Sequence, residues 1–252
     1  MFINTHYSTN NMKILILSDI HANWYALEAI LDKESHDALI FLGDAVDFGP
    51  SPRKCVKFLM KSSKTHFWGV RGDHDHAMAF GIESKCPGEL NTISSITREW
   101  GEGFLSSEDV GFLRRLPLNN QFSIDGLNFE LVHGSEHGSD LTTVEISNCN
   151  AESLNSDQLE DKKELNFILA GHSHKPFIKT FAKTIIINPG SVGQPRDFNP
   201  KASYAVIDDG NAYIRRVSYD IERTVNDLER SSLPKPLTSK LSSMLYNGSI
   251  LN

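Results

Sequence analysis

The feature that most constrains the fold is an alternation of short apolar segments and amphipathic segments near the start of the chain. Residues 13–20, 37–44 and 65–70 are short and apolar, and 13–20 is also rich in β-branched side chains, which is typical of buried strands. Between them, residues 23–35 and 52–62 repeat apolar side chains at helical spacing. Strand, helix, strand, helix, strand is the pattern of βαβ units, so this part of the chain predicts a mainly parallel sheet.

The pattern changes further along the chain. Residues 90–116 predict two helices, and Ser106 or Ser107 is the expected N-cap of the second, because acidic residues follow at once. Two Asp-Gly pairs between alternating apolar segments indicate β-hairpins. Further strands are expected within residues 120–134, 167–174, 177–191 and 203–219, and a closing helix within 220–232. This order predicts one α/β (α+β) domain of two mixed β-sheets flanked by helices over residues 12–252, after a flexible N-terminal extension at 1–11.

Composition excludes several classes of function. The net charge is −7, from 25 basic and 32 acidic residues, which argues against broad binding to nucleic acid. The longest apolar runs, such as 14–17 and 184–187, are far shorter than the roughly 20 residues that span a bilayer. The N-terminus lacks the basic start and apolar stretch of a secretory signal, so we expect a cytoplasmic protein without membrane attachment.

Two further patterns are missing. The three cysteines, Cys55, Cys86 and Cys149, share no CxxC spacing, and we expect reduced, mostly structural thiols. No GxGxxG or GxxxxGK[ST] motif follows any expected strand, which argues against a Rossmann or P-loop nucleotide site.

Carboxylates and imidazoles stand at the ends of the expected strands. These ends are Asp19-Ile20-His21, Gly43-Asp44, Gly72-Asp73-His74-Asp75, His133-Gly134 and Gly171-His172-Ser173-His174. Loops at the carboxyl ends of the strands meet at one crevice in open α/β sheets. In "DIH" and "HSH" the two candidate ligands are two residues apart, which places them on the same side of an extended chain. Mixed Asp and His ligands suit divalent manganese, iron or zinc, so the sequence predicts a metal site at this edge.

In this order, the motifs "DIH", "GDAVDFGP", "GDHD", "VHG" and "GHSH" resemble those of the calcineurin-like metallophosphoesterases. The segments "NPGSVGQPR" and "YDIERTVNDL" are similar to the small bacterial and archaeal phosphodiesterase branch, and the resemblance spans roughly residues 12–230. It implies a four-layer αββα sandwich with two divalent metal ions. Manganese is the first choice, with iron, zinc, nickel and magnesium as alternatives.

Carried over position by position, the resemblance gives each residue of the strand ends a role. The implied ligands are Asp19, His21 and His174 for the first metal, Asp73, His133 and His172 for the second, and Asp44 bridging both. His74 matches the position that stabilises the attacked phosphate or protonates the leaving oxygen. A hydroxide shared by the two cations would attack phosphorus in line. Arg196, in "NPGSVGQPR", is a candidate contact for a substrate phosphate.

Position 73 departs from the family pattern, which has asparagine there. Two divalent cations against Asp19, Asp44 and a hydroxide leave a formal charge of +1, and Asp73 reduces this to zero. We expect Asp73 to tighten or re-select the second metal and to weaken the attraction for an anionic phosphate. Asp75 and His76, which follow, are expected to support the structure or the neighbouring ligands.

The leading hypothesis is a metal-dependent phosphoesterase, specifically a phosphodiesterase acting on a small phosphate ester. The enzymatic alternatives on the same scaffold are a phosphomonoesterase and a dinucleoside-polyphosphate hydrolase. The protein phosphatase branch fits less well, since it has "GDxVDRG" and "GNHE" where this chain has Phe48 and Asp75. A non-catalytic metal-binding scaffold is the alternative from a different class, with Asp73 as its sign of lost chemistry.

Overall fold

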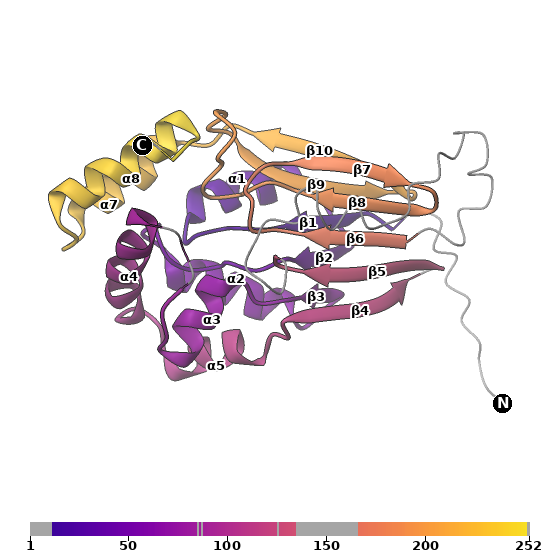
Figure 1. Ribbon diagram of the computed structural model, residues 1–252, viewed down its shortest axis with the longest axis horizontal. Coiled ribbons are helices and arrows are strands. Elements are labelled where there is room, and N and C mark those ends of the chain that lie inside the picture. Colours follow the sequence, from indigo (N-terminus) through magenta and orange to yellow (C-terminus); the bar gives the residue numbers. More distant parts are fainter. Residues whose placement is uncertain (1–11, 85, 87, 125, 135–165, 251–252) are drawn as a thin grey trace.

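The computed structural model describes residues 12–134 and 166–250, apart from positions 85, 87 and 125 (Figure 1). The strands of this part are β1 (Ile14–Leu17), β2 (Ala38–Phe41), β3 (Phe67–Gly69), β4 (Asn119–Ile124), β5 (Leu127–Val132), β6 (Asn166–Ala170), β7 (Phe177–Phe181), β8 (Thr184–Asn188), β9 (Ala202–Asp208) and β10 (Asn211–Val217). The helices are α1 (Trp24–Lys33), α2 (Pro52–Ser62), α3 (Asp73–Phe80), α4 (Glu89–Glu102), α5 (Ser107–Arg115), α7 (Ile221–Arg230) and α8 (Lys235–Asn247). The expected N-terminal extension at 1–11 lies outside the described residues.

The strands form two five-stranded mixed sheets, with the orders β10-β9-β1-β2-β3 and β4-β5-β6-β8-β7. In the first sheet β1, β2 and β3 are parallel, as the βαβ pattern predicted, and β9 and β10 add antiparallel strands. In the second sheet β5, β6 and β8 are parallel, while β4 and β7 are antiparallel at its edges. The predicted architecture of two mixed sheets flanked by helices is therefore confirmed.

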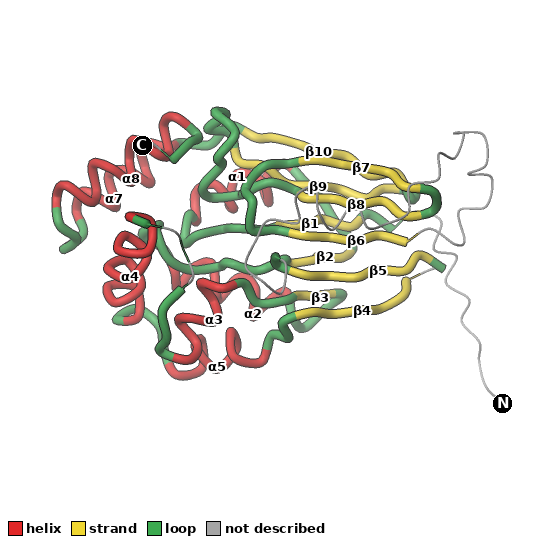
Figure 2. The backbone as a smooth tube through the Cα atoms, in the orientation of Figure 1, coloured by secondary structure: helices red, strands yellow, loops and turns green. Residues whose placement is uncertain are grey.

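Alternating side chains of β1 face two different cores. Leu15 and Leu17 pack against helices α1, α2 and α5, whereas Ile14 and Ile16 pack against apolar side chains of the second sheet. All four are buried, because a central strand of a sandwich is covered on both faces. Figure 2 shows the helices gathered at one end and one side of the two sheets, with the longer strands running away from them.

Two helices were not predicted from the sequence. Helix α3 has no amphipathic pattern, and its polar start looked like a loop at a strand end. Asp73 and Asp75 lie in its first turn, where carboxylates favour the positive end of the helix dipole, and Gly81 ends it at φ 65°. Helix α8 buries Leu237, Leu241 and Leu245 in an apolar cluster that it shares with α7.

The loops that follow β1, β2 and the later strands are joined by backbone hydrogen bonds. The N–H groups of Asp19 and His21 donate to the carbonyls of Gly43 and Asp44, at 2.9 and 3.0 Å. On the other side, the N–H of Gly193 donates to the carbonyl of Asp19 at 3.0 Å. These bonds hold the strand-end loops of both sheets at one edge of the sandwich. No helix among the described residues is long and apolar enough to cross a membrane.

Candidate metal centre

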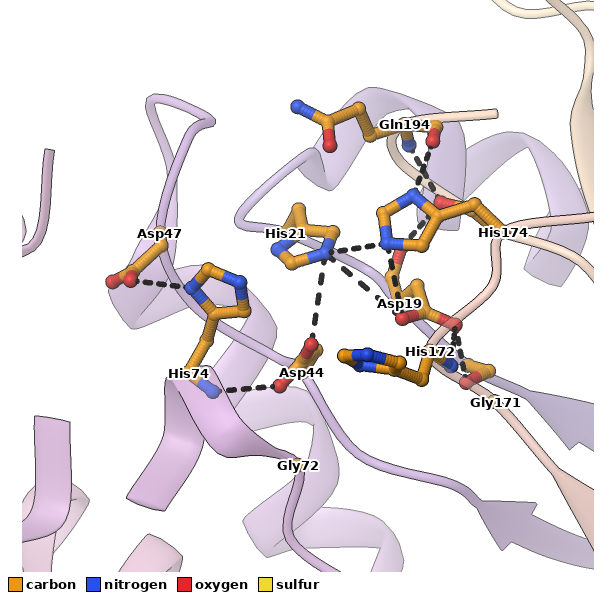
Figure 3. A network of polar contacts seen from close by, with 12 residues as sticks. Asp19, His21, Asp44, Asp47, Gly72, His74, Gly171, His172, His174 and Gln194 are labelled. Atoms are coloured by element: carbon orange, nitrogen blue, oxygen red, sulfur yellow. Dashed lines mark hydrogen bonds and ion pairs between the residues drawn. The ribbon is translucent and has the colours of Figure 1, made fainter. Parts of the chain in front are cut away.

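The structure brings together all seven side chains that the sequence proposed as metal ligands, and Figure 3 shows most of them around one centre. They form two groups, within each of which the ligand atoms lie within 4.8 Å of one another. The first group is Asp19, His21 and His174, and the second is Asp44, Asp73, His133 and His172. Each group has donor atoms for one divalent cation.

Short contacts link the donor atoms of the first group. Nε2 of His174 lies 3.2 Å from Oδ1 of Asp19 and 3.2 Å from Nε2 of His21. Nε2 of His21 lies 3.8 Å from Oδ2 of Asp44, which connects this group to the second. All four side chains are buried.

In the second group His133 lies between two carboxylates. Its Nε2 is 3.0 Å from Oδ2 of Asp44 and 3.3 Å from Oδ1 of Asp73. Nδ1 of His172 is also 3.2 Å from Oδ1 of Asp73. The side chains of Asp73 and His172 are 24% and 27% exposed, so this group is the one that solvent or a substrate reaches.

Three of the four imidazoles are oriented by backbone carbonyls. The Nδ1–H groups of His21, His133 and His174 donate to the carbonyls of Val46, Leu42 and Gln194, at 3.0, 2.6 and 2.5 Å. Such a bond fixes the tautomer and leaves the Nε2 lone pair facing the centre. This is the arrangement that proteins use to present histidine to a metal ion.

Several donor atoms of the centre need a cation. With both Nδ1 atoms protonated, the Nε2 lone pairs of His21 and His174 face each other across 3.2 Å, which is repulsive unless a positive charge lies between them. Among the described residues, Oδ1 of Asp19, Oδ2 of Asp73 and Nε2 of His133 are buried without a hydrogen-bond partner. Buried polar atoms left unpaired are costly, so the donor set fits metal ions.

The electrostatics of the centre also favour ionised carboxylates. Burial by itself raises the pKa of Asp19, but the neighbouring imidazoles of His174, His133 and His21 outweigh it and hold the pKa below its ordinary value. For Asp44, burial is outweighed in the same way by His133, and the pKa is lowered. Burial and the neighbouring His174 lower the pKa of His21, which keeps its imidazole neutral. Ionised carboxylates and neutral imidazoles are the forms that bind metals.

The prediction from the sequence that "DIH" and "HSH" are extended, with both candidate ligands of each pair on the same side, is wrong. These segments are not extended, because Asp19, His21, His172 and His174 all have positive φ, at 53°, 45°, 68° and 58°. Left-handed residues turn the chain at each candidate ligand and direct both side chains of a pair to the centre. Positive φ costs energy for residues other than glycine and is frequent at functional sites.

The third cluster also differs from the prediction, because Asp73 and His74 lie in the first turn of α3 and not in a loop. The Asp75 carboxylate holds this turn against the loop after β2. Oδ2 accepts from the N–H groups of Asp44 and Gly72, and Oδ1 accepts from that of Ala45, at 2.8, 3.3 and 2.8 Å. His76, for its part, accepts at Nδ1 from Arg71 Nε at 3.0 Å.

His74 is buried beside the centre and is held by Asp47. Its Nδ1 lies 2.7 Å from Oδ2 of Asp47, and that oxygen also accepts the Ser94 hydroxyl at 2.8 Å. The ring of Phe48 packs edge-on against the rings of His74 and His21, with centroids 5.0 and 4.9 Å apart. Burial lowers the pKa of His74, but the charges of Asp44 and Asp73 and the Asp47 hydrogen bond raise it well above its ordinary value. The imidazole is therefore a hydrogen-bond donor.

Two other side chains reach the same region. Nη2 of Arg196 donates to Oε1 of Gln194 at 3.0 Å, and its Nε is buried without a partner. Sγ of Cys86 lies 3.2 Å from Nε2 of His74, a contact that the sequence gave no reason to expect. Cys55 is a free, fully buried thiol of the core, as predicted, whereas Cys149 lies outside the described residues.

The fold and the site define the class of protein: a two-sheet α/β protein with a candidate metal centre at its strand ends. Comparison with known proteins gives the family. The model of the calcineurin-like phosphoesterase superfamily domain matches residues 12–211. The protein MJ0912 of Methanocaldococcus jannaschii is 31% identical over 249 residues, which cover 90% of this chain and 96% of that protein. The chain therefore belongs to the calcineurin-like phosphoesterase superfamily.

Solved structures agree with this assignment. A metallophosphoesterase from Sphaerobacter thermophilus is 28% identical with a TM-score of 0.70, and the match covers 94% of this chain and 99% of that one. The hypothetical protein PH1004 of Pyrococcus horikoshii has a TM-score of 0.73 at 20% identity, covering 94% and 98%. The second likeness shows the fold alone.

Proposed function

We propose that this protein is a phosphodiesterase that uses two divalent metal ions, with manganese as the first choice. The observation that carries the proposal is the set of imidazoles whose Nδ1–H groups are tied to backbone carbonyls and whose Nε2 atoms converge on buried carboxylates. The similarity to the metallophosphoesterase of Sphaerobacter thermophilus supports metal-dependent phosphoester chemistry.

Each side chain of the centre has a proposed place in the reaction. Asp19, His21 and His174 would hold one ion, Asp73, His133 and His172 would hold the other, and Asp44 would serve both. When bound, two divalent cations lower the pKa of a water molecule between them and neutralise charge on the phosphoryl oxygens. The buried positions of these ligands fix the geometry before substrate binds, so little reorganisation is needed during the reaction.

His74 is the proposed catalytic residue. Asp47 accepts a hydrogen bond from Nδ1–H and fixes the ring, so Nε2–H is directed toward the second group, 3.8 Å from Oδ2 of Asp73. A protonated imidazole here donates a hydrogen bond to a phosphoryl oxygen or transfers the Nε2 proton to the leaving oxygen. Arg196 is the proposed contact for the other phosphate oxygens, because its Nε is buried without a partner and its Nη2 donates to Gln194, whose carbonyl orients His174.

Asp73 favours a phosphodiester over a phosphomonoester. The carboxylate removes the formal positive charge that an asparagine would leave, and its side chain lies in the more exposed of the two groups. A dianionic monoester loses more Coulombic attraction from this change than a monoanionic diester does. The two esters are therefore the critical comparison.

The test is hydrolysis of bis(p-nitrophenyl) phosphate and p-nitrophenyl phosphate by the metal-free protein after addition of Mn²⁺. The diester is expected to be hydrolysed faster, and His74→Ala to lower kcat about 10²- to 10⁴-fold, the usual range for general acid–base catalysis. His66→Ala, at an exposed position outside the centre, is the matched control. Asp73→Asn is expected to raise the monoester rate relative to the diester rate.

The results separate the candidate functions. Hydrolysis of the monoester in preference to the diester would replace the phosphodiesterase by a phosphomonoesterase. A dinucleoside polyphosphate in the same assay tests the third enzymatic candidate. Uptake of two metal ions without turnover of any of these esters would indicate a metal-binding scaffold instead.

A further inference from the structure

The side chains of Asp73, His74 and Cys86 form a second cluster of potential ligands beside the candidate metal centre. Sγ of Cys86 lies 3.2 Å from Nε2 of His74, and that nitrogen lies 3.8 Å from Oδ2 of Asp73. One ligand atom of each residue lies within 4.8 Å of the other two. We propose that these three residues form a third metal position, which takes a thiophilic divalent cation such as Zn²⁺.

Asp73 can serve both this position and the centre already described, because its two oxygens face different groups. Oδ1 lies 3.3 and 3.2 Å from ring nitrogens of His133 and His172. Oδ2 faces His74 and is buried without a hydrogen-bond partner. An asparagine has one ligand oxygen and a non-ligating NH₂ group, so only the carboxylate of this chain supplies a ligand in both directions.

His74 is oriented as a metal ligand would be. Asp47 and Ser94 hold its Nδ1 at 2.7 and 3.1 Å, which leaves Nε2 as the atom that faces Cys86. A carboxylate on the far nitrogen of a histidine is the usual support of a zinc ligand and raises its basicity. The Cys86 thiol proton and the Nε2 proton of His74 would both leave to solvent when the metal binds, while the Nδ1 proton stays in the bond to Asp47.

The spacing of the donor atoms suits tetrahedral zinc. Ordinary Zn–S and Zn–N bond lengths place sulfur and nitrogen about 3.6 Å apart, and nitrogen and oxygen about 3.4 Å apart. The observed separations of 3.2 Å and 3.8 Å therefore differ from a tetrahedral site by only a few tenths of an ångström. Cys86 is partly exposed, which leaves room for an ion to enter and for water as the fourth ligand.

A metal at this position would change what the protein does. Thiolate selects zinc over manganese or magnesium, so the third position discriminates between metals that the Asp and His groups accept alike. Coordination uses the Nε2 atom with which His74 is proposed to contact phosphate. Excess zinc is therefore expected to inhibit hydrolysis, a consequence that rests on the proposed function, whereas the metal binding itself does not.

The test of binding is titration of the metal-free full chain with Co²⁺, a spectroscopic substitute for zinc. We expect three cobalt ions per chain and a near-ultraviolet thiolate-to-cobalt charge-transfer band that accompanies one of them. Cys86→Ser is expected to lose the band and one equivalent of cobalt, and Asp73→Asn to weaken the same equivalent. Cys149→Ser is the matched control and is expected to keep both. A wild-type protein without the band, or a band that persists in Cys86→Ser, would overturn the proposal.

The inhibitory consequence has a separate measurement. With the Mn²⁺-loaded protein and bis(p-nitrophenyl) phosphate, Cys86→Ser is expected to need at least about tenfold more Zn²⁺ for half-inhibition, which corresponds to about 1.4 kcal/mol of lost zinc affinity. Equal zinc sensitivity of the variant and the wild type would refute the inhibitory role. If no ester is hydrolysed at all, the proposed function fails, while the cobalt titration still decides whether the third position exists.

Discussion

Replacing the Asp75 carboxylate by an amide tests how the centre is held together. Its two oxygens accept three backbone N–H groups, from Asp44, Ala45 and Gly72, at 2.8, 2.8 and 3.3 Å. In Asp75→Asn, one of the two carboxylate oxygens is replaced by an NH₂ group, which donates hydrogen bonds and cannot accept them. In the better of its two orientations the amide still accepts two of the bonds and leaves the Ala45 N–H buried and unpaired.

The expected cost follows from these bonds. A buried donor without a partner costs about 1 to 3 kcal/mol, and each of the other two bonds loses about 1 kcal/mol when its acceptor becomes neutral. The sum is a loss of about 3 to 5 kcal/mol, or roughly 6 to 20 °C in the melting temperature of a domain of this size. The loop that carries Asp44 would lose its support, so metal affinity is expected to fall as well.

The assay is denaturant unfolding of the metal-free protein, with Asp32→Asn, at an exposed position of α1, as the control for the same chemical change. Burial and the charge of Asp44 raise the pKa of Asp75 to about 7. The unfolded pKa of an aspartate is about 3.9, so between about pH 4 and pH 7 the folded state binds a proton that the unfolded state has lost. Wild type therefore loses stability as the pH rises through this range, whereas Asp75→Asn does not. The difference between Asp75→Asn and wild type is expected to be larger near pH 5 than above pH 7. A destabilisation near pH 5 as small as that of Asp32→Asn, or a difference that grows with pH, would refute this expectation.

Three further predictions concern the fold around the centre. In Gly43→Ala, at φ 101°, the new Cβ would lie 2.4 Å from the backbone nitrogen of Gly72. The variant is therefore expected to lose at least about 2 kcal/mol of stability, measured by calorimetry, and most of its metal uptake, measured by metal analysis. The buried Tyr204 hydroxyl donates to Glu34 at 3.0 Å, and burial of Glu34 is outweighed by its bonds to Lys13, Tyr204 and Arg215, which lower its pKa. This stabilisation is present above the unfolded pKa of about 4.3 and is lost as the pH falls through the lower folded pKa. Glu34→Gln is therefore expected to lose less stability in acid than wild type does. Parallel losses of stability in acid for the variant and the wild type would contradict this prediction. Adding Mn²⁺ to the chelated protein at about 100 times its Kd should stabilise it by about 2.7 kcal/mol and raise the melting temperature by roughly 5 to 11 °C, whereas an unchanged melting curve would argue against a metal centre.

The sequence by itself determined the strands and the positions of the site. Short apolar runs such as residues 14–17 and 38–41 are typical of buried strands, and the helical segment between them favours a parallel pair, as the structure has it. Parallel strands bring their carboxyl ends to one edge, so polar residues at Asp19 and Asp44 had to meet there. Local periodicity and connectivity, both of which can be read along the chain, are enough to place these residues at one edge.

What the tertiary structure decided are the contacts between segments far apart in sequence. Nothing in the local pattern shows that the carbonyls of Leu42 and Gln194 fix the tautomers of His133 and His174. Nor does it show that Cys86 reaches His74. These contacts depend on how the two sheets and their loops pack. Local propensity sets which elements form, but only long-range packing sets which atoms of those elements touch.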